Sequence, residues 1–276
     1  MGTPLYNELS TSYDELFARN INEYISNSVN QENEDYDYNV FYPSFGVKRS
    51  EQCEFLIYGQ ACNDWQVKFN IKERNNLLNT QKLLLEAKTY SNGYFDDGND
   101  VHNPLDWINI YWSKKSYKES IQTLRKAQYY EDFDYKAYSS FFWNVIYKTI
   151  SDYHQFDRDK WHWSSKMVWS NLYKIAPPSG NPTNFEKSMQ VKLSVQLVKL
   201  EIEEIKPKYC IVLTNYEWWK PFASALNPAE LKMNGFSEIE AVQKYRSTYI
   251  IVTTRPYRSG NEKHVGQILE VIKKLN

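Results

Sequence analysis

Short apolar runs, separated by long stretches of helical periodicity, set the architecture of this chain. Four runs have the length and the continuous apolar character of strands that are buried on both faces: residues 55–58, 167–172, 209–213 and 248–252. The intervals between them are long enough to hold crossover helices, so we expect the four strands to pair in parallel.

In most of the intervals between the predicted strands, apolar residues recur at helical spacing. Helices are predicted over residues 6–28, 80–88, 116–128, 135–153, 185–205 and 262–275. In the segment 185–205, apolar residues recur at steps of four and three from Val191 and Val195 onward, and Pro207 ends the helix. We therefore predict an α/β fold, a three-layer α/β/α sandwich around a central, mainly parallel four-stranded sheet.

The predicted elements form one domain over residues 1–276, because no internal repeat and no flexible linker interrupts them. The segment of about 92–163 is an aromatic-rich, largely helical insertion to which the sequence assigns no chemistry. Within it, residues 96–100 superficially resemble a calcium loop. They lack the alternating ligands and the closing glutamate of such a loop, so we interpret them as a solvated turn.

Composition narrows the class of protein. Hydrophobic residues make up 42% and charged residues 24%, as in soluble globular proteins. No apolar run reaches the roughly 20 residues that span a bilayer, so no membrane partner is expected. The cysteines and histidines have no metal-ligand spacing, so neither a metal nor a cofactor is expected. We predict a cytoplasmic protein with reduced cysteines, whose oligomeric state is left open.

The net charge of −1 argues against broad electrostatic attraction to nucleic acid, since nonspecific binders carry a basic surplus. The 9 Trp and 23 Tyr offer flat faces on which bases can stack. Packing in the core and at its rim is the more general role of such side chains. A nucleic-acid partner is therefore compatible with the composition but is not indicated by it.

Polar, aromatic and basic residues follow the predicted strands. Because the carboxyl ends of parallel strands lie on one edge of a sheet, where ligands bind, we expect these residues to converge on one pocket. The candidates are Gly59, Gln60, Asn63, Asp64, Trp65 and Phe69 after the first strand, Asn171 in the second, Asn215 after the third, and Arg255 and Arg258 after the fourth.

The order and content of these segments resemble the uracil-DNA glycosylase superfamily. Gly59-Gln60-Ala61-Cys62 follows the first strand in the register of that family's Gly-Gln-Asp-Pro motif. Asn171 matches the asparagine with which the family reads the base, and residues 254–258 occupy the place of its His-Pro-Ser motif. The resemblance covers roughly residues 40–75 and 165–276.

The resemblance implies a role for each candidate. Asp64 is the water-orienting base, Asn171 reads the Watson–Crick edge, and Arg255 stabilises the anionic leaving base. Trp65 or Phe69 stacks on a flipped base, and the partner is a nucleobase or DNA. The remaining candidates are ligand-binding: Gly59, Gln60, Asn63, Asn215 and Arg258.

Two departures from the family pattern change this expectation. Ala61 stands where the family has a residue that activates the attacking water, and Arg255 stands where it has a histidine. Asp64 lies three residues beyond Ala61, and a bulged loop is needed to bring it back to the pocket. The simplest interpretation is a retained fold with a lost or altered chemistry.

A structural interpretation stays open beside each functional one. Gly59 serves backbone geometry or a ligand contact, Gln60 binds a ligand or ties down its own loop, and Asp64 is a base or a helix cap. Asn171 reads a ligand or satisfies buried main-chain groups. The two arginines bind phosphate or are solvated, and Trp218-Trp219 forms a pocket wall or packs in the core.

Three functional hypotheses follow. The first is a divergent glycosylase-like protein that binds a nucleobase or nucleic acid, with cleavage of a damaged-base N-glycosidic bond left open. The second is a noncatalytic protein that binds a ligand or partner in the same crevice, as the missing carboxylate at Ala61 favours. The third is a hydrolase of another nucleoside or nucleotide that uses Asp64 or Glu217.

Overall fold

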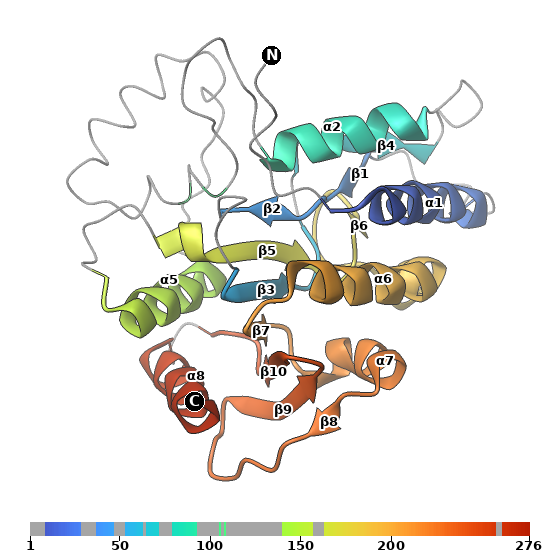
Figure 1. The fold of residues 1–276 in the computed structure, drawn as a ribbon. Helices are drawn as coiled ribbons and strands as arrows, with labels where there is room; N and C mark the ends of the chain where they lie inside the picture. Colours follow the sequence, from blue (N-terminus) through green and yellow to red (C-terminus); the bar gives the residue numbers. More distant parts are fainter. Residues whose placement is uncertain are drawn as a thin grey trace, which may run out of the picture.

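Two β-sheets organise the protein, as seen in a computed structural model that describes residues 9–28, 37–46, 53–62, 65–71, 79–92, 105, 108, 140–156, 163–257 and 261–276. The main sheet has seven strands in the order β2-β5-β3-β7-β10-β9-β8 (Figure 1). A second sheet has three strands in the order β4-β1-β6.

The main sheet is mixed. Its strands are β2 (Ser44–Phe45), β5 (Met167–Asn171), β3 (Phe55–Gly59), β7 (Tyr209–Val212), β10 (Thr248–Thr253), β9 (Ile239–Tyr245) and β8 (Ala229–Glu230). Strand β3 pairs in parallel with β5 and β7, and β10 pairs in parallel with β7, whereas β2, β9 and β8 pair antiparallel. The chain is thus mixed α/β, as predicted, but the sheet is larger than the four strands expected from the sequence.

Helices cover both faces of this sheet (Figure 1). Phe55 and Ile57 of β3 share a core cluster with α5 (Phe141–His154) and α8 (Asn261–Leu275). The alternate residues, Leu56 and Tyr58, share a second cluster with α6 (Asn184–Ile205) and α7 (Tyr216–Leu226). This two-residue period follows from the pleat, and it sends neighbouring side chains of one strand to opposite helical layers.

Helix α6 begins and ends where its sequence dictates. Thr183 accepts a hydrogen bond from the Glu186 main-chain N–H, and the Glu186 carboxylate accepts one from the Thr183 N–H, which forms a capping box. The helix ends at Lys206 in the left-handed conformation, before Pro207. Val198 and Ile202 of the predicted apolar stripe are buried, whereas Val191 and Val195 are only half-buried. Polar residues are buried on the same helix as well: Glu186, Gln190, Ser194 and Glu201.

Two more helices lie beside the main layers. Helix α1 (Thr11–Asn27) packs on α6 and falls within the predicted helix 6–28, and α2 (Thr80–Asn92) packs on α1. A short 3-10 helix, η4 (Trp163–Lys166), leads into β5. The helix predicted over 135–153 corresponds to α5, while the helix predicted over 116–128 and the turn at 96–100 lie outside the described residues.

The small sheet fixes the loop that follows β3. It consists of β4 (Lys68–Asn70), β1 (Asp37–Val40) and β6 (Ile175–Ala176), all antiparallel. Asn39 of β1 donates from Nδ2 to the carbonyl oxygens of Cys62 at 3.1 Å and Pro177 at 2.9 Å, and its Oδ1 accepts from the Trp65 N–H at 3.2 Å. The segments after β3 and β5 are thereby held together.

Two further observations concern the described part of the chain. None of its helices combines the length and apolar character needed to cross a membrane. Cys53, Cys62 and Cys210 are buried and form no disulfide bond. Burial raises the pKa of Cys53 to about 12 and also raises that of Cys210, so both side chains act as small hydrophobes in the core.

Candidate functional site

The residues that follow β3, β5, β7 and β10 lie side by side along one margin of the main sheet, called here the strand-end edge. Gly59 pairs with Asn171 in the parallel register of β3 and β5. Beyond the strands, the Gln60 Nε2 donates to the Thr214 carbonyl oxygen at 3.4 Å. The Asn215 N–H donates to the Thr253 carbonyl oxygen at 3.0 Å. The structure thus brings together segments that are far apart in the sequence.

Asn171 lies at one flank of this edge, because β5 is the outermost of the four strands that form it. Its side chain is on the face that α5 covers, and the residue is 2% exposed. A Cβ atom at Gly59 would lie 2.5 Å from Asn171 Oδ1 and 3.5 Å from the ring of Phe142 on α5. Gly59 is therefore required by the close approach of the Asn171 carboxamide, because any larger residue displaces it.

The Asn171 Nδ2 is buried and has no hydrogen-bond partner anywhere in the described ranges. A buried amide N–H that makes no hydrogen bond costs roughly 1–3 kcal/mol, so such groups usually have an explanation. Two residues earlier on the same face of β5, the Trp169 indole N–H is likewise buried without a partner among the described residues. One end of β5 thus presents two unsatisfied donors.

Asn215 caps a helix at this edge, whereas Arg255 is exposed to solvent. Asn215 has a φ of 96°, and its side-chain oxygen accepts from the Trp218 N–H at 3.2 Å, so it caps α7. Arg255 is exposed, two residues beyond β10. Trp219 is fully buried and donates from its indole to the Gln243 side-chain oxygen at 2.8 Å, so packing rather than a pocket wall describes this residue.

The two aromatic candidates after β3 are buried in the core. Trp65 is 4% exposed, and its ring lies 5.1 Å from that of Phe41 and 5.5 Å from that of Trp169. Phe69 is 3% exposed and stacks on Tyr38 at 5.7 Å. Neither ring has a free face in this conformation, so stacking on a base requires its neighbours to move.

Three sequence candidates, Asn63, Asp64 and Arg258, lie outside the described residues. Gln60 and Ala61 are described and half-buried. The Ala61 side chain is a methyl group, which can neither orient water nor accept a proton.

Sequence reasoning missed a buried ionic network directly behind Asn171. Glu201 of α6 and Lys174 after β5 have fully buried side chains, 2.6 Å apart. The Glu201 carboxylate also accepts hydrogen bonds from Tyr13 at 2.5 Å, Tyr58 at 2.7 Å and Ser170 at 2.9 Å. Every partner is a donor, and four donors on two oxygens satisfy a carboxylate well.

Lys174 connects this network to the strand-end edge. Its Nζ donates to the Ser170 hydroxyl and to the Asn171 main-chain oxygen, each at 2.6 Å. Burial lowers the pKa of Lys174, and the Glu201 carboxylate opposes that shift. Burial raises the pKa values of Tyr13 and Tyr58 well above the usual value, and Glu201 raises them further, so both remain protonated donors. Only the apolar surroundings of two charged residues hinted at this network in the sequence.

A second polar cluster lies where α8 begins. His264 is 2% exposed, its Nδ1 lies 3.9 Å from Glu238 Oε2, and its Nε2 is without a hydrogen-bond partner among the described side chains. Burial lowers the pKa of His264 to about 4, against the attraction of Glu238. The imidazole is therefore neutral at physiological pH.

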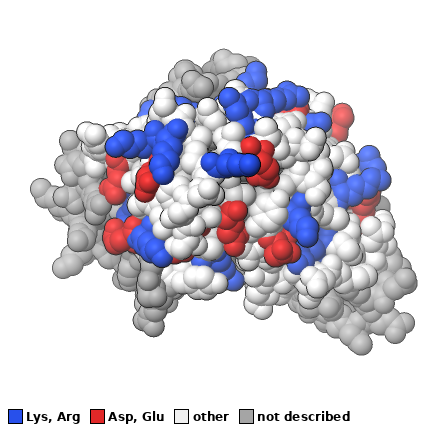
Figure 2. Space-filling model, turned by 90° about the horizontal axis from the view of Figure 1, so that it is seen from below, with Lys and Arg blue, Asp and Glu red and all other residues white. Residues whose placement is uncertain are grey.

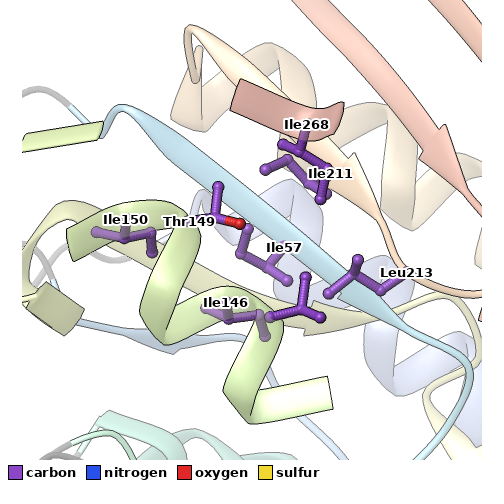
Figure 3. A pocket seen from close by; sticks show the side chains of 8 residues that line it. Ile57, Ile146, Thr149, Ile150, Ile211, Leu213 and Ile268 are labelled. Atoms are coloured by element: carbon purple, nitrogen blue, oxygen red, sulfur yellow. The ribbon is translucent and has the colours of Figure 1, made fainter. Parts of the chain in front are cut away.

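One small hollow in the described core is not a ligand site. It lies between the sheet and helices α5 and α8, and it is too narrow to hold a water molecule. Figure 3 shows that its lining is aliphatic apart from the Thr149 hydroxyl. Across the described residues, no three His, Cys, Asp or Glu side chains gather closely enough to bind a metal ion.

Surface charge does not favour a polyanion on the face seen in Figure 2. Lys and Arg side chains lie there beside Asp and Glu rather than in a separate basic area. Ion pairs in the described part of the chain include Arg246 with Glu203 at 2.8 Å, Lys263 with Glu238 at 3.2 Å and Lys274 with Glu270 at 2.9 Å. Exposed pairs of this kind contribute little to stability, but they cancel the local potential.

The chain matches no protein-family model and no curated protein sequence. Its function is therefore inferred from the residues and distances of the strand-end edge.

Proposed function

We propose that this protein binds a nucleobase, free or as a nucleoside, at the strand-end edge against Asn171. The observation that carries the proposal is the buried Asn171 carboxamide, whose N–H donors have no partner among the described residues beside a glycine that leaves room for it. Asparagine amides pair naturally with the donor and acceptor edges of bases. A ligand with acceptor atoms at this position can accept hydrogen bonds from these N–H groups.

Position separates Asn171 from other buried polar groups. Asn20 of α1 is also buried, with an unpartnered carboxamide within the described chain, but it lies on a helix rather than at the carboxyl ends of parallel strands. Ligands of open α/β sheets bind at those ends. The Trp169 indole N–H, two residues earlier on the same face of β5 and without a partner among the described residues, adds a second donor. Together they favour a ligand rich in carbonyl oxygens.

The resemblance to the uracil-DNA glycosylase superfamily supports the same ligand class. The parallel order β5-β3-β7-β10, with helices on both faces, is compatible with a three-layer α/β/α sandwich in which the family's motifs lie at the strand ends. Ala61 in the water-activating position favours binding over cleavage. The near-zero net charge favours a free base or nucleoside over a long polyanion.

Calorimetric titration with uracil, thymine, hypoxanthine and their nucleosides tests this proposal. We expect binding of at least one of them, weakened about tenfold or more by Asn171→Ala. Asn20→Ala is the matched control, because it removes an equally buried and unpartnered carboxamide away from the edge. Absence of binding by every compound, or an equal loss in both variants, refutes the proposal.

A parallel assay separates binding from catalysis. Incubation with DNA that contains uracil, hypoxanthine or a thymine mismatch measures base release. We expect none, because the carboxylate that the chemistry needs is absent at Ala61. Release that depends on Asn171 would identify the protein as a glycosylase and move attention to Asp64.

A further inference from the structure

We propose that the buried Lys174–Glu201 pair is the positioning device of Asn171, an inference that rests on the proposed nucleobase site. Lys174 donates to the main-chain oxygen of Asn171 at 2.6 Å, and Glu201 holds that ammonium group at 2.6 Å. Neither charged side chain contacts solvent. The pair therefore fixes the turn that follows β5 rather than meeting a ligand itself.

The network and the proposed ligand lie on opposite faces of the same strand. Ser170 points toward α6 and donates to Glu201, whereas Asn171, the next residue, points toward α5. Changes in the network therefore act on the ligand only through the β5 backbone. This separation makes a positioning role distinguishable from direct contact.

The surrounding bonds show how the turn transmits position. The Leu172 N–H donates to the Gly59 carbonyl oxygen at 2.9 Å, and the Tyr173 N–H donates to that of Gln60 at 3.2 Å. Lys174 closes the turn by bonding back to Asn171. The ends of β3 and β5 are thus fastened to each other, with the buried ammonium group as the anchor on the α6 side.

A buried ion pair contributes little net stability, because apolar residues of similar volume often make a fold equally stable or more stable. In this protein the ion pair also provides a charge-assisted hydrogen bond from Lys174 to the main-chain carbonyl of Asn171. This bond is what the experiment must remove while the fold is kept.

The double variant Lys174→Met/Glu201→Gln removes both charges together and leaves no uncompensated ion in the core. Tyr58→Phe is the matched control, because it deletes one hydrogen bond to Glu201 but leaves the Lys174 bond to Asn171 in place. The first readout is the Asn171 side-chain NH₂ signal in an amide NMR spectrum, assigned through its loss in Asn171→Ala. It requires no ligand.

We expect the Asn171 NH₂ signal to shift or broaden in the double variant and to keep its position in Tyr58→Phe. Affinity for whichever nucleobase binds the wild type should fall about tenfold in the double variant and less than twofold in the control. An unchanged signal in a folded double variant overturns the positioning role. If no nucleobase binds the wild type, the proposed function fails, while the NMR comparison still decides the positioning.

A second pair, Lys174→Leu/Glu201→Leu, is used if the first does not fold. Circular dichroism and unfolding curves establish which variant is native. If neither double variant folds, the network is a requirement of the fold as a whole, and the positioning role is overturned.

Discussion

Gly59→Ala tests the close approach of Gly59 to the Asn171 carboxamide at the strand-end edge. The new Cβ atom would lie 2.5 Å from Asn171 Oδ1, where ordinary contacts begin near 3.4 Å, so the carboxamide must move by most of an ångström. The backbone of Gly59 is outside the left-handed region, so an alanine fits the local conformation and the cost is steric. Overpacking of this kind costs about 1–3 kcal/mol, partly offset by about 0.4–1 kcal/mol from a less flexible unfolded chain.

Urea unfolding followed by tryptophan fluorescence measures this cost. We expect Gly59→Ala to lower the free energy of unfolding by about 1–2 kcal/mol. Gly266→Ala is the matched control, because a Cβ atom there meets nothing within 4 Å, and the helix gains about 0.5–1 kcal/mol. Combining Gly59→Ala with Asn171→Ala removes the obstructing oxygen, so the double variant should recover at least about 1 kcal/mol relative to additivity.

Two results would refute this reasoning. If Gly59→Ala resembled Gly266→Ala in stability, the approach of the Asn171 carboxamide would not be as close as described. If the clash existed but Asn171→Ala gave no rescue, another group would be responsible, with the ring of Phe142 at 3.5 Å as the next contact.

Three further predictions follow from buried groups. Lys174→Met alone should lower the free energy of unfolding by about 3–5 kcal/mol, because it strands the Glu201 carboxylate; denaturant titration measures this loss, and a cost below about 1 kcal/mol would contradict the buried pair. The pKa of His264 is about 4 in the folded protein and 6.5 in the unfolded chain, so protonation of this side chain favours unfolding. The free energy of unfolding should therefore fall as the pH drops from 6.5 to 4, by about 3 kcal/mol in total. Denaturation midpoints across that range should therefore change less in His264→Gln than in the wild type, and parallel curves would exclude the effect. All three cysteines should resist a thiol reagent in the native state and react together on unfolding, which a colorimetric thiol count can follow; a thiol that reacts rapidly without denaturant would contradict its burial.

The strands of the main sheet divide into those that local sequence predicts and those it does not. Strands β3, β5, β7 and β10 are continuous apolar runs, because they are covered on both faces. Strand β9 was missed because its residues alternate irregularly between burial and exposure, and one of its two buried residues is Gln243. Strand β1 was missed because it lies in a polar segment and is stabilised by pairing with distant residues.

The candidate site likewise has features that the sequence predicted and features that it did not. The parallel order of the strands was enough to predict that Gln60, Asn171 and the segment after β10 share an edge. The burial of Lys174 and Glu201 was not predictable, because charged residues are almost always exposed unless a partner far away in sequence neutralises them. Trp65 and Phe69 were predicted to face a ligand, but their aromatic neighbours enclose them, and only the tertiary packing brings those neighbours together.

The two outermost strands of the main sheet, β2 and β8, are each only two residues long. An edge strand this short offers too few unpaired main-chain N–H and C=O groups to pair with a strand of another molecule. The long apolar strands, which would otherwise template aggregation, are all interior. Growth of the sheet by addition of further chains is thus disfavoured at both ends.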